Sequence, residues 1–560
     1  MTIPNTELAG FGATEHTPQL GQRLAGAYHA YQWLASRELL ACAFILILTL
    51  GLRAALLPWL PIPQPMVHDE FSYLLAADTY VHGRLANPPH PFWEHFETFQ
   101  ELQQPTYSSK YQPLQGLVLA FGQRFFGEPW IGVYLSAALM CAAICWMLQG
   151  WIAPEWALLC ALFFTLRVGV LSYWMNSYFP GAIAGLGGAL ALGALIRIWR
   201  RQQFGHAITW AVGLTIVALA RPYDAAVLAS ATAGILLFWL IRKVHTPAKT
   251  LWLRVALPAA AILTLCAVGI GYNNYRVTGH VLTLPDQVFE REYAVVRMGA
   301  FSIFSLGHEP AYHHAAMRML FVDASVKLWA YARNHPVVLM FIKLYLLDNF
   351  FFPFWPLLIP LLLCPYDLNT PEERATALLL FVAMAMIAPL VTNQPHYVAV
   401  FAGMVYLRFL QTLTRLRSWH PSGKPLGPAL SAALVALLAM GLCFNFFSLI
   451  HNGGGRDFSS GLLLSQGAPF AADRKTVIEE LEKLPRHHLV LVRYAPEHDP
   501  HKEWVFNGAD INSSLIVWAR EMGPAQDGPF LQYFHNRRIW LLEPDRSPPQ
   551  LTPYATEAVQ

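Results

Sequence analysis

The hydrophobic positions of this chain fall into a series of apolar runs, each about as long as a lipid bilayer is thick. A hydrocarbon core of roughly 30 Å needs about 20 apolar residues in one helix. Hydropathy predicts such spans at residues 39–59, 131–151, 156–172, 181–199, 207–225, 226–241, 255–272, 350–364, 375–391, 398–413 and 428–447. The pattern therefore predicts an α-helical polytopic membrane protein with about 11–12 transmembrane helices.

Composition supports this class and excludes others. Only 13% of the 560 residues are charged, about half the share of a soluble domain, and the mean hydropathy is +0.36. The seven cysteines lie in apolar stretches without a CxxC pair, which favours small buried side chains over metal ligands or disulfides. The net charge is only +3, and the chain has no basic tail or zinc pattern, so we expect no nucleic-acid partner.

The basic residues set the orientation of the spans. Arginines and lysines gather in three short loops, at residues 197–201, 242–254 and 408–424. Because short cytoplasmic loops carry the excess of Lys and Arg, all three fall inside if the N-terminus is cytoplasmic. The sequence then predicts a cytoplasmic segment at 1–37, a transmembrane domain at 38–449 with long outer loops at about 60–130 and 273–336, and an extracytoplasmic domain at 450–560.

The tail beyond residue 450 changes from apolar spans to shorter alternating patterns. A helical pattern at 473–484 precedes a strand pattern at 488–494, and a second helical pattern at 529–536 precedes a strand at 538–542. Helices and strands that alternate at this spacing predict a small α/β domain.

Two adjacent acids, Asp69 and Glu70, follow the end of the first span. A carboxylate that is partly shielded from water gains basicity, so this pair is a candidate catalytic site for taking a proton from a hydroxyl. The alternative is that both acids only stabilise the start of the next helix, where acids are favoured. His68 beside them leaves a divalent cation open, but no ligand spacing supports one, and we assign no metal or other cofactor.

Four basic side chains at the outer ends of the spans are candidates for holding a phosphate group. Lys110 precedes a proline-broken turn and can act as a point charge, although such a lysine is also a common surface residue. Arg221 interrupts an apolar run, where it either binds substrate or only pairs with Asp224 three residues later. Arg276 opens the second long outer loop, and His396 opens a later span, where a structural role is the alternative.

The loop at 173–178 combines aromatic and amide side chains at the outer surface. Its Asn176 and Tyr178 are candidates for lining an acceptor or sugar pocket, together with Tyr73 and Tyr111. The favoured alternative is an aromatic belt at the membrane interface. We interpret Arg167, deeper along its span, as a structural arginine whose head reaches toward water.

These motifs resemble the C-type (GT-C) glycosyltransferase superfamily, in the branch with protein O-mannosyltransferases and lipid A aminoarabinose transferases. The resemblance rests on the acid pair after the first span, with Tyr73 and Ala77 following it, and on the order of the spans, with a long outer loop first and His396-Tyr397 opening a later span. It also rests on Lys110-x-x-Pro113-Leu114-Gln115, which is similar to the Lys-Pro-Pro-Leu stretch of the aminoarabinose transferases. The inserted Tyr111-Gln112 departs from that stretch. The resemblance covers about residues 37–417.

The resemblance implies a role for each candidate. Asp69 would be the catalytic base or orient the acceptor hydroxyl, with Glu70 supporting it. Lys110 and nearby arginines would neutralise a lipid-linked phosphate as it leaves.

The resemblance thus implies an integral-membrane glycosyltransferase that moves a hexosyl or pentosyl sugar from a polyprenyl-phosphate carrier to an acceptor hydroxyl on the outer face. The acceptor is a lipid, glycan or protein, and the expected location is the bacterial inner (plasma) membrane, in contact with its lipids. Two alternatives stay open: a non-enzymatic lipid or glycolipid transporter or flippase, and a cell-envelope assembly protein whose tail binds a partner.

Overall fold

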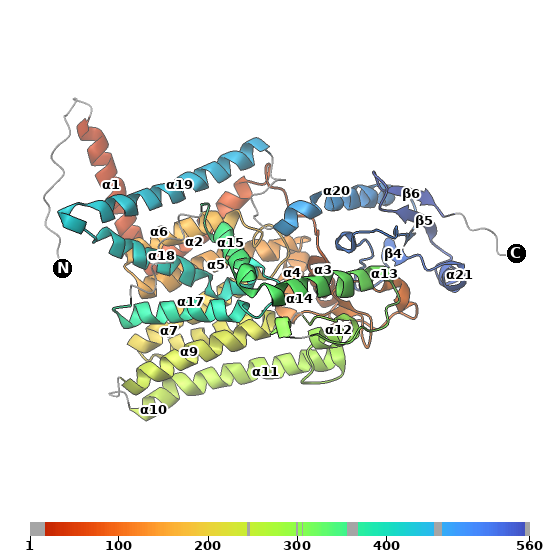
Figure 1. Cartoon of the computed structure of the whole chain (residues 1–560), viewed down its shortest axis with the longest axis horizontal. Coiled ribbons are helices and arrows are strands. Elements are labelled where there is room, and N and C mark those ends of the chain that lie inside the picture. Colours follow the sequence, from red (N-terminus) through yellow and green to blue (C-terminus); the bar gives the residue numbers. More distant parts are fainter. Residues whose placement is uncertain are drawn as a thin grey trace.

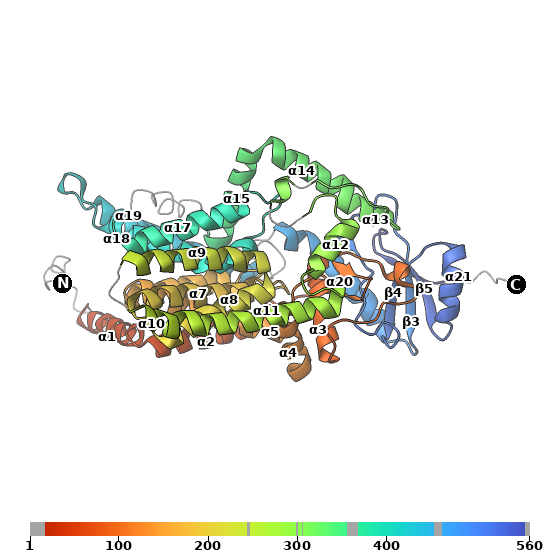
Figure 2. The same ribbon diagram turned by 90° about the horizontal axis from the view of Figure 1, so that it is seen from below.

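The protein is an elongated molecule with a helical bundle at one end and a small sheet at the other, as Figures 1 and 2 show. The computed structural model describes residues 17–242, 247–297, 301–304, 306–354, 368–452 and 462–554. The chain enters the bundle through α1 (Thr17–Ala35) and leaves it for the sheet through α20 (Leu462–Glu482).

Seven segments of the described chain are long and apolar enough to cross a membrane, and each coincides with a predicted span. They are α2 (Glu38–Ala55), α5 (Trp130–Trp151), α7 (Gly181–Arg200), α9 (Pro222–Arg242), α10 (Ala248–Leu251) continuing into α11 (Leu257–Thr278), the turn Pro395–Phe401 continuing into α18 (Ala402–Arg417), and α19 (Leu426–Asn452). The predicted polytopic helical fold is confirmed.

Shorter helices occupy three of the other predicted spans. These are α6 (Pro154–Phe164) with its π-helical continuation Thr165–Val170, α8 (Phe204–Ala220) and α17 (Pro371–Ile387). The predicted span at 350–364 lies mostly outside the described residues.

Small residues let the central helices approach closely. On α7, a Cβ added to Gly187 would lie 2.8 Å from the carbonyl oxygen of Gly213 on α8, and a Cβ on Gly213 would lie 2.6 Å from that of Gly187. Helices in lipid associate through close packing of this kind, because burial of apolar surface gives no driving force there. The sequence of α7, rich in Gly and Ala, therefore suits the centre of the bundle.

The basic loops lie at the end of the bundle away from the sheet, and ion pairs connect them to neighbouring helices. Arg197 contacts Glu38 at 2.7 Å, Arg200 contacts Glu372 at 3.9 Å, and Arg415 contacts a neighbouring acid at the start of α17. The turn between α18 and α19 lies at this same end (Figure 1). The predicted basic loops thus share one side of the molecule, and the sheet lies on the other.

The two long loops that the sequence predicts on the outer side, called the outer loops below, fold into short elements between bundle and sheet. The first supplies α3 (His68–Val81), the turn Trp93–Phe96, a two-stranded hairpin of β1 (Glu101–Leu102) and β2 (Ser108–Ser109), and α4 (Pro113–Phe126). The second supplies α12 (Pro285–Tyr293), α13 (Ala315–Arg318) and α14 (Ser325–Asn334) before α15 (Pro336–Phe351). In Figure 2 the helices α13, α14 and α15 form an arch over one side of the molecule.

The C-terminal residues form the predicted α/β unit. A four-stranded sheet has the order β4-β3-β5-β6, with β3 parallel to both β4 and β5, and β6 antiparallel to β5. Its elements after α20 are β3 (His488–Val492), β4 (Ile516–Arg520), α21 (Pro524–Tyr533), β5 (Arg538–Glu543) and β6 (Gln550–Pro553). The sequence predictions missed β4 and β6. The central strand β3 is buried throughout, as expected for a strand covered on both faces.

The C-terminal unit shares its hydrophobic core with the first outer loop. Phe71 of α3 packs in one cluster with Val490 and Trp504, and Leu75 of α3 packs in a second with Leu489. The rings of Phe71 and Phe506 stack 4.0 Å apart. The helix that carries the acid pair is therefore held between the bundle and the C-terminal sheet.

Candidate active site

Glu70 fixes the start of α3. One of its carboxylate oxygens accepts hydrogen bonds from the backbone N–H groups of Met66, at 2.9 Å, and Val67, at 3.2 Å. The other accepts the N–H of Tyr178 at 3.0 Å, which ties α3 to the loop between α6 and α7. Because Glu70 is fully buried and both its oxygens are engaged, its contacts match the helix-start alternative, and its contribution to a site is to hold α3 in place.

Burial of Glu70 gives the protein a measurable pH dependence. Burial raises the pKa of Glu70 from its ordinary value of 4.5 to about 7, outweighing the three N–H donors that favour the carboxylate. The folded state then binds more protons than the unfolded state between these two values, so this group's contribution to stability falls as pH rises through that window. We expect the melting temperature of wild type, relative to Glu70→Gln, to decrease from about pH 5 to about pH 8. A constant difference across this range would contradict the assignment.

Asp69, the neighbour of Glu70, is partly exposed and faces two tyrosines. Its carboxylate accepts a hydrogen bond from the hydroxyl of Tyr111, and the rings of Tyr73 and Tyr111 stack 4.4 Å apart. Burial and the negative charge of Asp69 raise the pKa of Tyr111, which keeps that phenol protonated and donating. Tyr111, inserted between the lysine and the proline, therefore has a structural role: its hydroxyl forms a hydrogen bond with Asp69, the predicted base.

Lys110 lies beside the same tyrosine. Its ammonium is 5.3 Å from the centre of the Tyr111 ring and 4.8 Å from that of Phe289, and it pairs with Asp286 of α12 at 3.2 Å. Burial opposes the charge of Lys110, but Asp286 and Asp69 outweigh it and raise the pKa of the lysine. Lys110 is therefore a charged, buried lysine, and the surface alternative is wrong for this residue.

Arg221 lies at the junction of α8 and α9, near the same group. It forms the predicted pair with Asp224, and its guanidinium lies 4.8 Å from the ring centre of Tyr397. The charges of Arg221, Asp69 and Lys110 lie close enough to act electrostatically on the hydroxyl of Tyr397, and those of Asp69 and Arg221 act on the hydroxyl of Tyr73. The acid, the lysine and the arginine thus converge around a cluster of tyrosines at one end of the bundle.

The other predicted site residues lie elsewhere or serve the packing. Asn176 accepts a hydrogen bond from Arg53 at 2.9 Å and donates to two backbone carbonyls of its own loop, and Tyr178 donates to the carbonyl of Pro63 at 3.0 Å. His396 is buried, bonded to Tyr173 at 2.8 Å. These contacts brace the loop between α6 and α7.

Arg276 is exposed on α11, where it contacts the Tyr272 hydroxyl one turn earlier at 3.1 Å. No contact in the described part of the chain joins it to Asp69 or Lys110. The structure therefore gives no geometric support for Arg276 as a second phosphate cation at the tyrosine cluster.

The favoured belt interpretation of the loop at 173–178 is wrong. Tyr173, Trp174 and Tyr178 are all at most 4% exposed, and Trp174 packs against Phe350 with ring centres 4.9 Å apart. A membrane-interface belt needs rings that reach the lipid headgroups, whereas these rings fill the protein interior. The pattern misled because aromatic residues near the end of a span suit both environments.

Arg167 is also buried, and it does not reach toward water. Its guanidinium donates to the carbonyls of Asn349 and Phe350 at the end of α15. The structural role predicted for this arginine agrees with these contacts, but the mechanism is the capping of another helix.

Three residues at the cluster were not singled out from the sequence. Tyr397 was noted only for opening a span, and Asp286 and Phe289 on α12 are far from Lys110 along the chain. No spacing rule connects residues so distant, so only the folded structure reveals these partners. Among the described residues, no group of three or more His, Cys, Asp or Glu side chains has the arrangement of a metal site.

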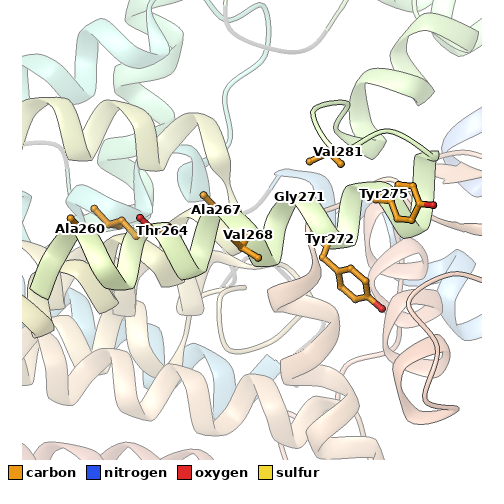
Figure 3. Close-up of a pocket in the computed structure, with 9 residues that line it drawn as sticks. Ala260, Thr264, Ala267, Val268, Gly271, Tyr272, Tyr275 and Val281 are labelled. Atoms are coloured by element: carbon orange, nitrogen blue, oxygen red, sulfur yellow. The ribbon is translucent and has the colours of Figure 1, made fainter. Parts of the chain in front are cut away.

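An apolar groove runs along the outward face of α11 (Figure 3). It has a volume of about 760 Å³ and extends from Ala260 past Val268 to Tyr272 and Tyr275, with Val281 lying beside the helix. Its lining is almost wholly apolar, and it follows the axis of α11, a candidate membrane span. The groove is therefore suited to a hydrocarbon chain.

No family model matches this sequence, and no curated protein matches it. Several solved structures align with it at low identity. The apo oligosaccharyltransferase of Archaeoglobus fulgidus is 12% identical with a TM-score of 0.45, and the match covers 81% of this chain and 62% of that one. This chain therefore spans less than two thirds of that enzyme's length.

ArnT from Cupriavidus metallidurans is similar along more of its own length. Its apo structure is 12% identical with a TM-score of 0.48, covering 89% of this chain and 92% of that one. Its structure bound to undecaprenyl phosphate is 11% identical with a TM-score of 0.46 and the same coverage.

Proposed function

We propose that this chain is an integral-membrane glycosyltransferase that moves a sugar from a polyprenyl-phosphate carrier to an acceptor hydroxyl on the outer face of the membrane. The observation that carries the proposal is the convergence of Asp69, Lys110 and Arg221 around Tyr73, Tyr111 and Tyr397. A transfer of this kind needs one base and a cation that meets a departing phosphate, and the cluster holds both.

The proposed reaction gives each of these groups a role. Asp69 takes the proton of the acceptor hydroxyl as that oxygen forms a bond to the anomeric carbon of the sugar. The bond from that carbon to the phosphate oxygen breaks, and the carrier leaves as polyprenyl phosphate with the electron pair. Lys110 and Arg221 stabilise the charge that develops on this phosphate. The reaction involves no oxidation or reduction. The proton on Asp69 returns to solvent after the product leaves.

The tyrosines give the cluster a surface for a sugar. Tyr111 is partly exposed and stacks on the buried Tyr73 ring beside a carboxylate, so its ring can meet the apolar face of a pyranose or furanose while the carboxylate meets the hydroxyls. The Tyr111 hydroxyl bonds Asp69 where an acceptor hydroxyl would bond in the proposed reaction. The acceptor therefore has to displace this hydroxyl, or share the carboxylate with it.

The test of this function is a transfer assay with the purified full chain in nanodiscs. Radiolabelled sugar on a polyprenyl phosphate is supplied with a membrane extract that contains candidate acceptors, and label is followed from the carrier into a second product. Appearance of free polyprenyl phosphate together with labelled acceptor supports the proposal. Movement of the intact donor across sealed vesicles without cleavage would instead identify the transporter alternative, and neither activity would favour the assembly protein.

Replacing Lys110 by methionine should weaken transfer strongly. Methionine keeps the length and the apolar stem of the side chain but removes the charge that faces the phosphate, so we expect kcat/KM for the donor to fall by about a hundredfold. The matched control is Lys475→Met, which changes a lysine exposed on α20 and should leave the rate unchanged. Equal rates for Lys110→Met and wild type would remove Lys110 from the proposed mechanism.

A further inference from the structure

A second pocket lies on the far side of α3 from the tyrosine cluster. It has a volume of about 320 Å³ between α3, the end of α4 and the C-terminal unit, and its lining includes Phe71, Leu74, Asp78, Gln123, Arg474 and Asn507. Residues 71, 74, 75 and 78 share one face of a helix, whereas Asp69 and Tyr73 share the opposite face. The pocket is therefore a site separate from the proposed transfer site.

Arg474 brings an uncompensated charge to this pocket. Its guanidinium lies 4.8 Å from the ring centre of Phe71 and 5.4 Å from that of Trp518, and its Nε is buried without a hydrogen-bond partner. No carboxylate in the described ranges of the chain forms an ion pair with it. Burial lowers the pKa of Arg474 to about 10, so the side chain stays charged at neutral pH. A buried, unpaired donor of this kind needs an explanation.

Three buried arginines of this protein differ from Arg474, which is partly exposed but has a buried Nε. Arg520 pairs with Glu503, Arg53 bonds Asn176, and Arg167 bonds backbone carbonyls. Each of them therefore has an acceptor supplied by the chain. The guanidinium of Arg474 is stacked on aromatic rings, which hold its plane but give its buried Nε–H no acceptor.

The carboxylate that lines the pocket is engaged with other groups. One oxygen of Asp78 accepts the backbone N–H of Ala509 at 2.7 Å, and the other accepts the Gln123 amide at 3.1 Å and lies 3.6 Å from His82. Asp78 therefore joins α3 to the C-terminal unit and the end of α4, and does not neutralise Arg474.

The place of the pocket indicates which anions can reach it. Gln123 belongs to α4, and the opposite face of α4 exposes Leu117, Phe121 and Phe125 by 44%, 47% and 70%. An exposed apolar ridge on a helix at the outer end of the bundle is suited to the surface of a bilayer. Phosphate groups are the most abundant anions at that depth, and the fork of an arginine matches phosphate geometry with two parallel hydrogen bonds.

We propose that this pocket binds a phosphate group, with the Arg474 guanidinium donating to its oxygens and the stacked rings of Phe71 and Trp518 fixing the guanidinium plane. The phosphate belongs either to a lipid headgroup or to a free phosphate monoester, since both present the same oxyanion. A phosphate bound here lies against the face of α3 opposite to Asp69. The proposed binding site is therefore independent of the transfer reaction.

The test measures binding to the purified full chain in nanodiscs. One arm titrates inorganic phosphate into nanodiscs of phosphatidylcholine by calorimetry, with sodium chloride at matched ionic strength as the blank. The other arm compares melting temperatures in nanodiscs of phosphatidylcholine with and without phosphatidylglycerol. Heat from inorganic phosphate identifies a free phosphate site, and a higher melting temperature with phosphatidylglycerol alone identifies a headgroup site.

Substitutions of Arg474 test whether either signal comes from phosphate bound in this pocket. Arg474→Gln should weaken the signal at least tenfold, and Arg474→Lys should weaken it less, because lysine keeps the charge and loses the fork. The matched control is Arg538→Gln, which alters another arginine stacked on a tryptophan, 4.3 Å from the Trp540 ring centre but exposed. This control should bind as wild type does.

Stability without phosphate separates binding from folding. Arg474→Gln removes an unpaired charge, so its melting temperature in phosphate-free buffer should equal or exceed that of wild type. If it unfolds instead, Arg474→Lys supplies the comparison. An equal signal in wild type and both variants, or none in wild type in either arm, overturns the proposal.

Discussion

Replacing Asp69 by asparagine should abolish most of the sugar transfer while the protein stays folded. Asparagine has the shape of aspartate and can still accept the Tyr111 hydroxyl, but it cannot take a proton from an acceptor. General-base catalysis contributes about 10²–10⁴-fold to a rate, so we expect kcat to fall within this range. The measurement is the initial rate of label transfer at saturating donor, in the nanodisc assay described above.

Two variants accompany Asp69→Asn. Asp69→Glu keeps a carboxylate but moves it by one methylene, and should retain part of the activity that asparagine loses. Asp323→Asn, on an exposed acid that pairs with Arg318, should transfer at the wild-type rate. If Asp69→Asn turned over like wild type with an unchanged melting temperature, Asp69 would not be the base, and the proposed mechanism would fail.

Replacing Arg520 by methionine should cost about 3–5 kcal/mol of unfolding free energy, because it leaves a buried carboxylate without a cation. Glu503 is fully buried and bonds Arg520, and Arg520 is itself only 3% exposed. The guanidinium also donates from Nε to the carbonyl of Glu97 at 2.8 Å, which joins the C-terminal unit to the first outer loop. Loss of Arg520 should therefore loosen the outer part of the protein first.

Denaturant unfolding, with limited proteolysis between β3 and β4 as the local readout, checks this prediction. Arg493→Met is the control, because Arg493 pairs with Glu521 near the surface and should cost about 1 kcal/mol or less. Adding Glu503→Gln to Arg520→Met removes the uncompensated charge and should restore part of the loss. Equal losses of unfolding free energy for the Arg520 and Arg493 variants would show that burial does not set the strength of the Arg520–Glu503 pair.

The combined core of α3 and the C-terminal unit connects this stability to the proposed activity. α3 carries Asp69 on one face, and on the other it stacks Phe71 on Phe506 and fixes Asp78 to the backbone of Ala509. A displacement of the C-terminal unit would therefore also displace the helix that carries the proposed base. A variant that loosens Arg520 should accordingly lower transfer as well as stability.

The sequence by itself determined the features that depend on local patterns. Runs of apolar residues located the spans, since hydropathy and helix length are properties of neighbouring residues. The change of period after residue 450 located β3 and β5, and the polar start of the first outer loop located the acid at the beginning of α3. The short strands β4 and β6 were missed, because each depends on the sheet it joins.

Only the tertiary structure decided which of the candidate residues meet. It separated Asp69, which faces the tyrosines, from Glu70, whose oxygens bind backbone N–H groups of two segments. It brought Lys110 to Asp286 on another outer loop, and it turned the aromatic loop at 173–178 inward. The physical reason is the same in each case: hydropathy and spacing act between near neighbours, whereas hydrogen bonds and ion pairs between distant residues exist only after the helices have packed.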